Sequence, residues 1–238
     1  MKHRLDQLLV QKGLVGNRSQ AGNYIKLGFV LVGGKTVTKP GQLVSAKDKI
    51  ELTIEQQYVS RAALKLASVT GTLKVDFNGK TVLDAGSSTG GFTDYALKHG
   101  AKKVIAIDVG TGQMHPALRG DPRVELHEKT DIRSFRSGQT IDIVLADLSF
   151  IGLREVLPEI AKLSNQSTQI LALLKPQFEA GKSEINKGIV KNDRLRRQIL
   201  KDFEAWAKNR FVIVGKADSQ VAGAYGNLER FYLLRKLK

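Results

Sequence analysis

Short apolar runs alternate with amphipathic stretches along the chain from residue 81 onward. Five runs rich in Val, Ile and Leu have the length of single strands, at 81–85, 103–108, 123–128, 141–147 and 168–175. Strands buried on both faces show such continuous apolar runs, and helical segments lie between them. The pattern predicts an α/β fold with a doubly wound, Rossmann-like parallel sheet.

Two further strand-like segments follow, at 210–218 and 226–237. Because little sequence separates them, we expect them to pair antiparallel at the edge of the sheet. Between the fifth strand and this pair lies a basic helical segment whose apolar stripe consists of Leu195, Ile199, Phe203 and Trp206. The stripe predicts core packing. Its basic face either holds RNA phosphates or is an ordinary solvated surface.

The first 57 residues have a different pattern. Leucines at helical spacing predict one helix near the start, and a second helix is expected over 18–27. Alternating apolar residues around Gly33-Gly34 predict a β-hairpin, and a last strand over 49–54 closes a small sheet. We therefore expect a small α+β domain over residues 1–57 and a larger catalytic-type domain over 58–238.

The excess of basic residues indicates which kinds of partner the chain could bind. The 38 Lys and Arg residues exceed the 23 Asp and Glu residues, which gives a formal net charge of +15. Such a field concentrates polyanions, so nucleic acid is the first candidate partner and an anionic membrane the second. Alternatively, the charge only keeps the protein soluble.

Several classes of protein are excluded by composition. The chain has no cysteine, which rules out disulfides and thiol nucleophiles, and its four histidines lack the spacing of metal ligands, so no metal is expected. No apolar run reaches the roughly 18 residues that span a bilayer, and the start does not resemble a signal peptide. We therefore expect a cytoplasmic protein without a transmembrane segment. No pattern indicates an oligomeric state.

The string RLDQLLVQKGLVGNRSQAGNYIKLGFVLVGGKTVTKPG, residues 4–41, resembles the S-four RNA-binding domain. In that family the second helix and the hairpin face RNA, so the resemblance implies an RNA-binding surface. Alternatively, these charges form an ordinary solvated face. The candidate RNA-binding residues are Arg4, Arg18, Lys26, Lys35 and, beyond the domain, Arg61.

A glycine-rich turn, DAGSSTGGF, follows the first long strand, and a helix is expected to begin near Thr93. Ligand crevices in doubly wound sheets lie at this end of the strands. The spacing differs from the G-x-G-x-x-G of dinucleotide sites. It also places Asp84 before the turn, where a carboxylate suits a cationic methionine moiety better than phosphates. We expect S-adenosylmethionine, with a nicotinamide cofactor or a purely structural loop as the alternatives.

Acidic residues also follow the next strands. Asp108 ends the second strand, where a carboxylate can accept hydrogen bonds from both ribose hydroxyls. Asp131 follows the third strand and is a candidate acceptor for an adenine amino group. The candidate cofactor-binding residues are Asp84, Gly86, Ser88, Thr89, Gly90, Gly91, Phe92, Asp108, Asp131 and Asp147.

The fourth and fifth strands end in Asp147 and Lys175. A lysine that leaves a buried strand either reaches solvent or is a functional amine. Because the ends of parallel strands meet in the crevice, we expect Lys175 to lie beside Asp147. Lys65 lies in an amphipathic helix just before the catalytic core, and Glu229 lies at the start of the last strand.

Lys65, Asp147, Lys175 and Glu229, in this order, resemble the tetrad of FtsJ-type RNA ribose 2′-O-methyltransferases. The strings YVSRAALKL, LDAGSSTGGFTD, IDVGTGQM, DPRVELHEKTDIR, VLADLSFIGLREVLP, LLKPQFEAG and GNLERF resemble the TlyA family, whose members are known as haemolysin-like proteins and as rRNA 2′-O-methyltransferases. The resemblance covers nearly the whole chain. Two departures are Ala62-Ala63, where glycines are common, and Asp131, where an asparagine is frequent.

The resemblance implies an S-adenosylmethionine-dependent enzyme that methylates a cytidine 2′-hydroxyl in large-subunit rRNA, with small-subunit rRNA as a further target. Its partners are then ribosomal RNA or ribosomal subunits. The residue types suit this chemistry. Lys175 can act as general base where burial or a second cation such as Lys65 disfavours its charged form, and Asp147 and Glu229 orient the amines.

Two rival functions remain from the sequence. One is a membrane-active haemolysin, for which no spanning helix, barrel pattern or secretion signal is present. The other is a non-catalytic RNA-binding ribosome-assembly factor, against which the intact Lys65, Asp147, Lys175 and Glu229 set argues.

Overall fold

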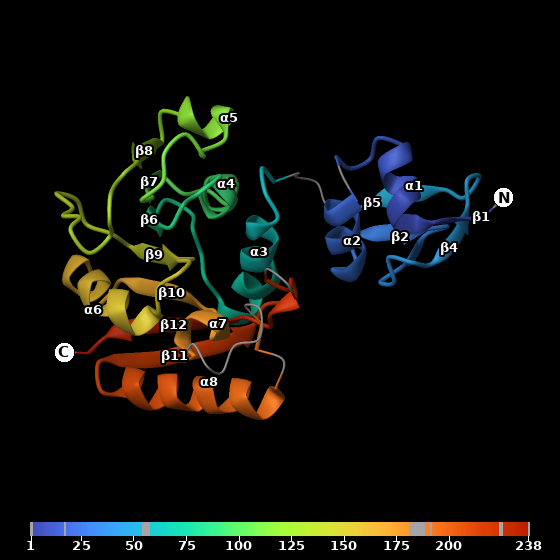
Figure 1. Cartoon of the computed structure of the whole chain (residues 1–238). Coiled ribbons are helices and arrows are strands. Elements are labelled where there is room, and N and C mark those ends of the chain that lie inside the picture. The colour runs from blue at the N-terminus through green and yellow to red at the C-terminus, as the bar shows by residue number, and fades with distance from the viewer. Residues whose placement is uncertain are drawn as a thin grey trace. The chain divides into compact units, whose positions relative to one another are not determined.

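The computed structural model describes residues 2–16, 18–53, 58–180, 189–190, 192–223 and 226–237. It divides into two compact units, residues 1–64 and 65–238 (Figure 1). The expected domain boundary after residue 57 adjoins residues 54–57, which lie outside the described residues, so it stays a prediction.

The first unit contains the two helices, the hairpin and the last strand that the sequence pattern predicts. Strand β2 pairs with β3 around Gly33-Gly34 and with β5 on its other side, both antiparallel. A second small sheet of β1 and β4 is absent from the sequence prediction. The elements are β1 (Lys2–Arg4), α1 (Leu5–Gln11), α2 (Arg18–Lys26), β2 (Val30–Val32), β3 (Lys35–Thr36), β4 (Leu43–Ser45) and β5 (Ile50–Leu52).

A buried carboxylate joins the two helices of this unit. Asp6 is 4% exposed, and its oxygens accept hydrogen bonds from the guanidinium groups of Arg4, at 2.9 and 3.1 Å, and Arg18, at 3.0 Å. The bond from Arg4, with a smaller contribution from Arg18, lowers the pKa of Asp6 to about 2 although burial acts in the opposite direction. Asp6 therefore links the start of α1 to the start of α2.

The second unit is built on a seven-stranded sheet in the order β11-β12-β10-β9-β6-β7-β8. The elements are α3 (Ala62–Leu73), β6 (Thr81–Ala85), α4 (Gly91–Lys98), β7 (Lys103–Ile107), α5 (Pro116–Arg119), β8 (Val124–His127), β9 (Ile143–Ala146), α6 (Leu153–Leu163), β10 (Gln169–Leu174), α7 (Pro176–Glu179), α8 (Asp193–Lys208), β11 (Phe211–Asp218) and β12 (Arg230–Lys236).

The predicted doubly wound α/β fold is confirmed. Strands β10, β9, β6, β7 and β8 are parallel neighbours, and β12 runs antiparallel to both β10 and β11. The expected antiparallel pair at the sheet edge is therefore present. Helix α4 begins at Gly91, slightly before the expected start near Thr93, because Gly90 turns the chain there. Strand β12 begins at Arg230, so Glu229, which was expected at the start of the strand, lies just before it.

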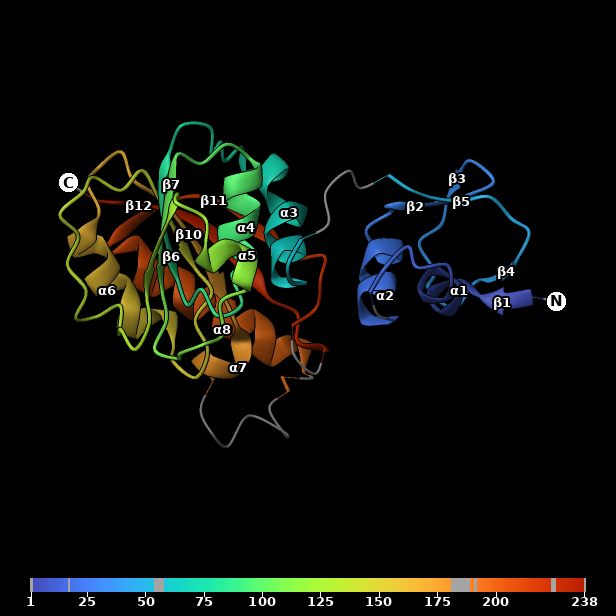
Figure 2. The same cartoon turned by 90° about the horizontal axis from the view of Figure 1, so that it is seen from above.

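Helices cover both faces of this sheet (Figure 2). On one face, α6 and α8 share an apolar cluster with alternate strand residues such as Leu83 and Tyr232. On the other face, Thr93 of α4 bonds Asp84 of β6, and Phe92 packs against Phe231 with ring centroids 6.0 Å apart. The side-chain alternation of each strand thus places its polar and apolar residues on defined faces.

The amphipathic segment before the last two strands forms α8. Ile199 and Phe203 are buried in the cluster, and Leu195 and Trp206 pack against it, which confirms the core stripe. One cation of its basic face, Arg196, pairs with Asp218 at 2.8 Å. The basic residues Lys187 and Lys191 lie outside the described residues.

We predict that Asp6→Asn loosens the first unit at neutral pH. A depressed pKa adds stability that is present above the unfolded value near 4 and is lost as pH falls toward 2. Removal of the charge should cost about 1–2 kcal/mol. Amide exchange in α1 and α2 of the full chain should then accelerate ~5- to 30-fold.

The matched control is Glu51→Gln, which removes a carboxylate from an exposed pair with Lys49 in the same unit. Such pairs contribute little, so its exchange should resemble that of the unmodified chain. Equal protection in Asp6→Asn and Glu51→Gln would contradict the assigned role of Asp6.

Candidate active site

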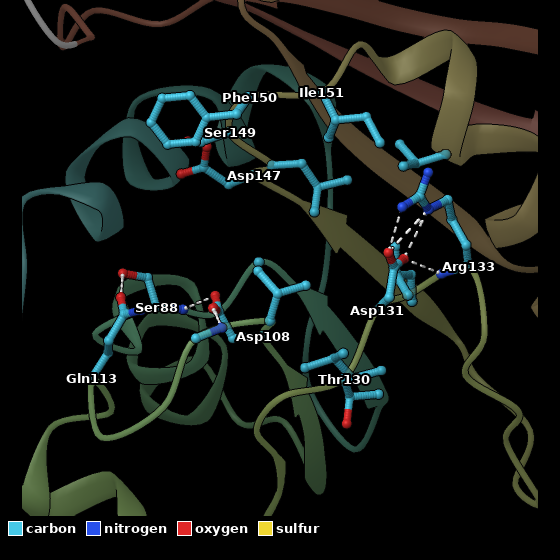
Figure 3. Close-up of a pocket in the computed structure, with 17 residues that line it drawn as sticks. Ser88, Asp108, Gln113, Thr130, Asp131, Arg133, Asp147, Ser149, Phe150 and Ile151 are labelled. Carbon is cyan, nitrogen blue, oxygen red and sulfur yellow. Dashed lines mark hydrogen bonds and ion pairs between the residues drawn. The ribbon is translucent and has the colours of Figure 1, made fainter.

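The crevice of this fold lies where β6 has parallel neighbours on both sides, β7 and β9, whose crossovers leave in opposite directions. A cavity of about 580 Å³ lies at the carboxyl ends of these strands (Figure 3). This volume is in the range of small-molecule and cofactor sites. The strand order therefore places the loops that follow β6, β7 and β9 around one cavity.

The glycine-rich turn forms part of the wall of this cavity. Gly86 has a φ of +86°, and an added Cβ would lie 2.7 Å from the carbonyl oxygen of Asp147, so only glycine fits. Gly90 has a φ of +90°, and its added Cβ would meet the side chains of Met114 and Leu118. The turn thus brings its backbone close to the loop after β9.

Asp84 lies on β6 beneath this turn and is fully buried. Its Oδ2 accepts a 2.6 Å hydrogen bond from the Thr93 hydroxyl, but its Oδ1 has no partner in the structure. Burial raises the pKa of Asp84 to about 7, and the charges of Asp147 and then Asp108 add to this effect. Asp84 is therefore close to half protonated at neutral pH, and the charge that it gains on losing its proton has no opposite charge bonded to it.

Asp108 organises two loops at the cavity. Its carboxylate accepts hydrogen bonds from the backbone N–H of Ser88, at 2.9 Å, and of Gly110, at 2.7 Å. Each carboxylate oxygen has a second lone pair, so Asp108 can still accept from a ligand hydroxyl.

Asp131 is already engaged on the opposite wall (Figure 3). Arg133 donates to both of its oxygens, at 3.0 and 2.6 Å, and the hydrogen bonds from this guanidinium lower the pKa of Asp131. The pair is half-exposed, and such pairs are weak enough for a ligand to compete.

The structure brings only some of the candidate cofactor residues together. Gly86, Ser88, Asp108, Asp131 and Asp147 line the cavity. The others do not line it: Asp84 lies beneath the turn, Thr89, Gly90 and Gly91 shape it, and Phe92 packs against Phe231. Sequence reasoning missed Gln113, Arg133, Ser149 and Phe150, which line the cavity from loops without a periodic pattern.

Two lysine–carboxylate pairs lie in the same unit. Lys175 Nζ is 2.7 Å from Asp147 Oδ1, as the adjacency of β9 and β10 predicts, and Lys65 Nζ donates a 2.6 Å hydrogen bond to Glu229 Oε2. All four side chains are at most 13% exposed. The second pair joins α3 to the residue before β12, so segments far apart in sequence meet here.

The candidate RNA-binding residues lie in the first unit. Arg4 and Arg18 are partly exposed although both bind Asp6, and Lys26 and Lys35 are exposed at the end of α2 and in β3. Arg61 lines a hollow with Gln20, Tyr24 and Tyr58. Their role in RNA binding stays a prediction.

A parallel sheet with a glycine-rich turn and carboxylates at its crevice defines the class of Rossmann-like, nucleotide-cofactor-binding folds. The chain matches the family model of the FtsJ-like methyltransferases over residues 58–236 and that of the S4 domain over residues 3–50. The S-four resemblance of the first unit is thereby confirmed.

Individual relatives show to which family of FtsJ-like methyltransferases the chain belongs. The chain is 39% identical to the Mycobacterium tuberculosis protein named 16S/23S rRNA (cytidine-2′-O)-methyltransferase TlyA, over 98% of this chain and 89% of the relative. It is 37% identical to Hemolysin A of Brachyspira hyodysenteriae, over 95% and 97%. A solved structure from Streptococcus thermophilus, provisionally named a hemolysin, aligns with a TM-score of 0.74 and 35% identity over 100% and 89%. The chain belongs to the TlyA family of S4-domain-containing, FtsJ-like methyltransferases.

Within the described ranges, no helix combines the length and apolar character needed to cross a membrane.

We predict that Asp84→Asn stabilises the second unit in a pH-dependent manner. Because the folded carboxyl keeps its proton to about pH 7 and the unfolded one only to about 4, the unmodified protein loses stability as pH rises through this window. The neutral amide avoids that loss. The melting temperature of Asp84→Asn relative to the unmodified protein should rise from pH 5 to pH 8 by at least ~2–4 °C.

Asp76→Asn, which changes an exposed carboxylate in the same unit, serves as the control and should show no such trend. A melting difference for Asp84→Asn that is constant from pH 5 to pH 8 would contradict the assignment.

Proposed function

We propose that this protein transfers a methyl group from S-adenosylmethionine to the 2′-hydroxyl of a cytidine in large-subunit rRNA. The observation that carries this proposal is the placement of two buried lysine–carboxylate pairs, Lys175–Asp147 and Lys65–Glu229, in the unit that holds the cofactor-sized cavity. Amines and carboxylates, without a metal or a nucleophile, suit proton removal from a hydroxyl.

The residues at the cavity fit S-adenosylmethionine. When bound, this cofactor supplies an electrophilic methyl group on a positively charged sulfur. The unpartnered Oδ1 of Asp84 and the nearby charge of Asp147 favour such a cation, and the bare Gly86 backbone leaves room for close approach. The free lone pairs of Asp108 suit ribose hydroxyls, and Asp131 would accept from an adenine amino group if it exchanged its bond with Arg133.

The chain's own residues then handle the proton. A ribose hydroxyl is a weak nucleophile and must lose its proton as it attacks the methyl group. In the proposal, Lys175 accepts this proton at Nζ, and the carboxylate of Asp147 at 2.7 Å stabilises the ammonium that forms. Lys65, held by Glu229, orients the hydroxyl. Positioning supplies much of the rate, because no covalent intermediate with the protein is needed.

Two features support rRNA as the acceptor. The S4 domain and the net charge of +15 favour a polyanion that is gripped through its phosphates. Relatives covering most of this chain carry the names 16S/23S and 23S rRNA (cytidine-2′-O)-methyltransferase. Because both names include 23S rRNA, we propose the large subunit as the target.

We predict that Lys175→Met abolishes methyl transfer and retains the cofactor. Methionine keeps the length of the stem and removes the amine, so the rate should fall at least ~100-fold, as for loss of a general base. The affinity for S-adenosylmethionine, measured by calorimetry, should change less than ~3-fold, because Lys175 does not line the cavity. Lys162→Met, which removes an exposed lysine of α6, is the control and should retain full activity.

The decisive assay incubates the protein with methyl-labelled S-adenosylmethionine and ribosomal subunits. Alkaline hydrolysis of the RNA needs a free 2′-hydroxyl, so label on the ribose appears in alkali-resistant dinucleotides and label on a base appears in mononucleotides. Label in mononucleotides, or none in RNA, would refute the proposal. Lysis of erythrocytes without RNA methylation would favour the haemolysin reading instead.

A further inference from the structure

Lys175 has a hydrogen-bond partner in addition to its ion pair with Asp147. Its Nζ donates a 2.9 Å hydrogen bond to the hydroxyl of Ser149, which lies in the loop after β9. Ser149 lines the cavity next to Asp147 and Phe150, on one wall (Figure 3). Lys175 itself is 8% exposed. The amine is thus held between a carboxylate and a hydroxyl that belong to the same loop.

The bond is not needed to satisfy the serine. Ser149 is exposed, so water can serve its hydroxyl equally well. The buried amine gains more, because a lysine stem has four rotatable carbons and no preferred direction for its nitrogen. The hydrogen bond therefore restricts the position of the lysine amine more than that of the serine hydroxyl.

Two neighbours, one hydrogen-bond acceptor and one ion-pair partner, restrict the direction of the amine. The nitrogen of a neutral lysine carries one carbon, two hydrogens and one lone pair, and these four point to the corners of a tetrahedron. The hydrogen bond to Ser149 fixes one N–H bond, and the Asp147 carboxylate, 2.7 Å from Nζ as an ion pair, occupies a second side of the nitrogen. The lone pair of the neutral amine is left with the remaining direction. The ring of Phe178, whose centroid is 5.8 Å from Nζ, flanks the same nitrogen.

The loop that carries Ser149 is braced against the helix that follows Lys175. Gly152 approaches α7 so closely that an added Cβ would lie 3.3 Å from the Phe178 carbonyl oxygen. Glu179 of α7 accepts a hydrogen bond from the Leu153 N–H. Phe150 has a φ of +66°, a strained backbone conformation that persists only where its surroundings hold it.

We infer that Ser149 is a positioning residue for the Lys175 amine: together with Asp147 it directs the nitrogen lone pair toward the hydroxyl that is methylated. The inference rests on the proposed function and adds a member to its proton-accepting group. No covalent step is added, since the serine keeps its proton and only accepts a hydrogen bond.

The test compares Ser149→Ala and Ser149→Thr in the full chain, with rRNA methylation and cofactor affinity measured separately. Threonine retains the hydroxyl and alanine does not. Ser149→Ala should lower kcat about 10-fold, the effect of losing one hydrogen bond between neutral groups in the transition state. KM for RNA and the Kd for S-adenosylmethionine should stay within ~2-fold, and Ser149→Thr should recover kcat to within ~3-fold of the unmodified enzyme.

Ser167→Ala is the matched control, because it removes an exposed hydroxyl before β10, at the opposite end of the strand from Lys175. Three results overturn the inference: an unchanged kcat in Ser149→Ala, a fall matched by an equal loss of cofactor affinity, or a Ser149→Thr as impaired as alanine. Failure of the proposed function differs from these, because the unmodified protein would then place no label on ribose.

Discussion

The candidate active site depends on the burial of charge in pairs. An isolated buried ammonium or carboxylate costs several kcal/mol, so each must meet an opposite charge with good geometry. Lys65 and Glu229 stand 164 positions apart and meet at 2.6 Å in the interior of the second unit. Gly223 allows this approach, because any Cβ there would collide with the Glu229 carboxylate. Helix α3 and strand β12 are thereby held in one arrangement relative to each other.

Asp84 departs from this rule, since one of its oxygens has no partner. Such groups concentrate at functional sites, where stability is lost in exchange for a preorganised electrostatic environment. The same position is stabilising only when a cation is close. The buried Asp84 carboxylate therefore lowers the stability of the folded protein when it loses its proton, and it favours the binding of a positively charged ligand over a neutral one.

Much of the second unit is readable from sequence, because buried parallel strands leave continuous apolar runs. The meeting of Asp147 and Lys175 follows from the same pattern, since neighbouring strands end at one edge. The three-residue strands β1 and β4 were missed, because their alternation is too short to differ from a loop. Ser149 was missed for a related reason: a serine in an irregular loop has no spacing that points to a lysine 26 positions away. The pairing of Asp131 with Arg133 was equally hidden, because it is set by local loop geometry.

The order of strands has a consequence for the synthesis of the protein. Strand β12 follows β11 in the chain but lies between β10 and β11 in the sheet. Until it is made, β10 exposes an unpaired edge, and β11 has no strand to join. Nascent chains at this stage carry hydrogen-bonding edges of the kind that recruit other chains. Glu229 directly precedes β12 in the chain. The sheet and the Lys65–Glu229 pair are therefore both completed only when this last segment has been synthesised.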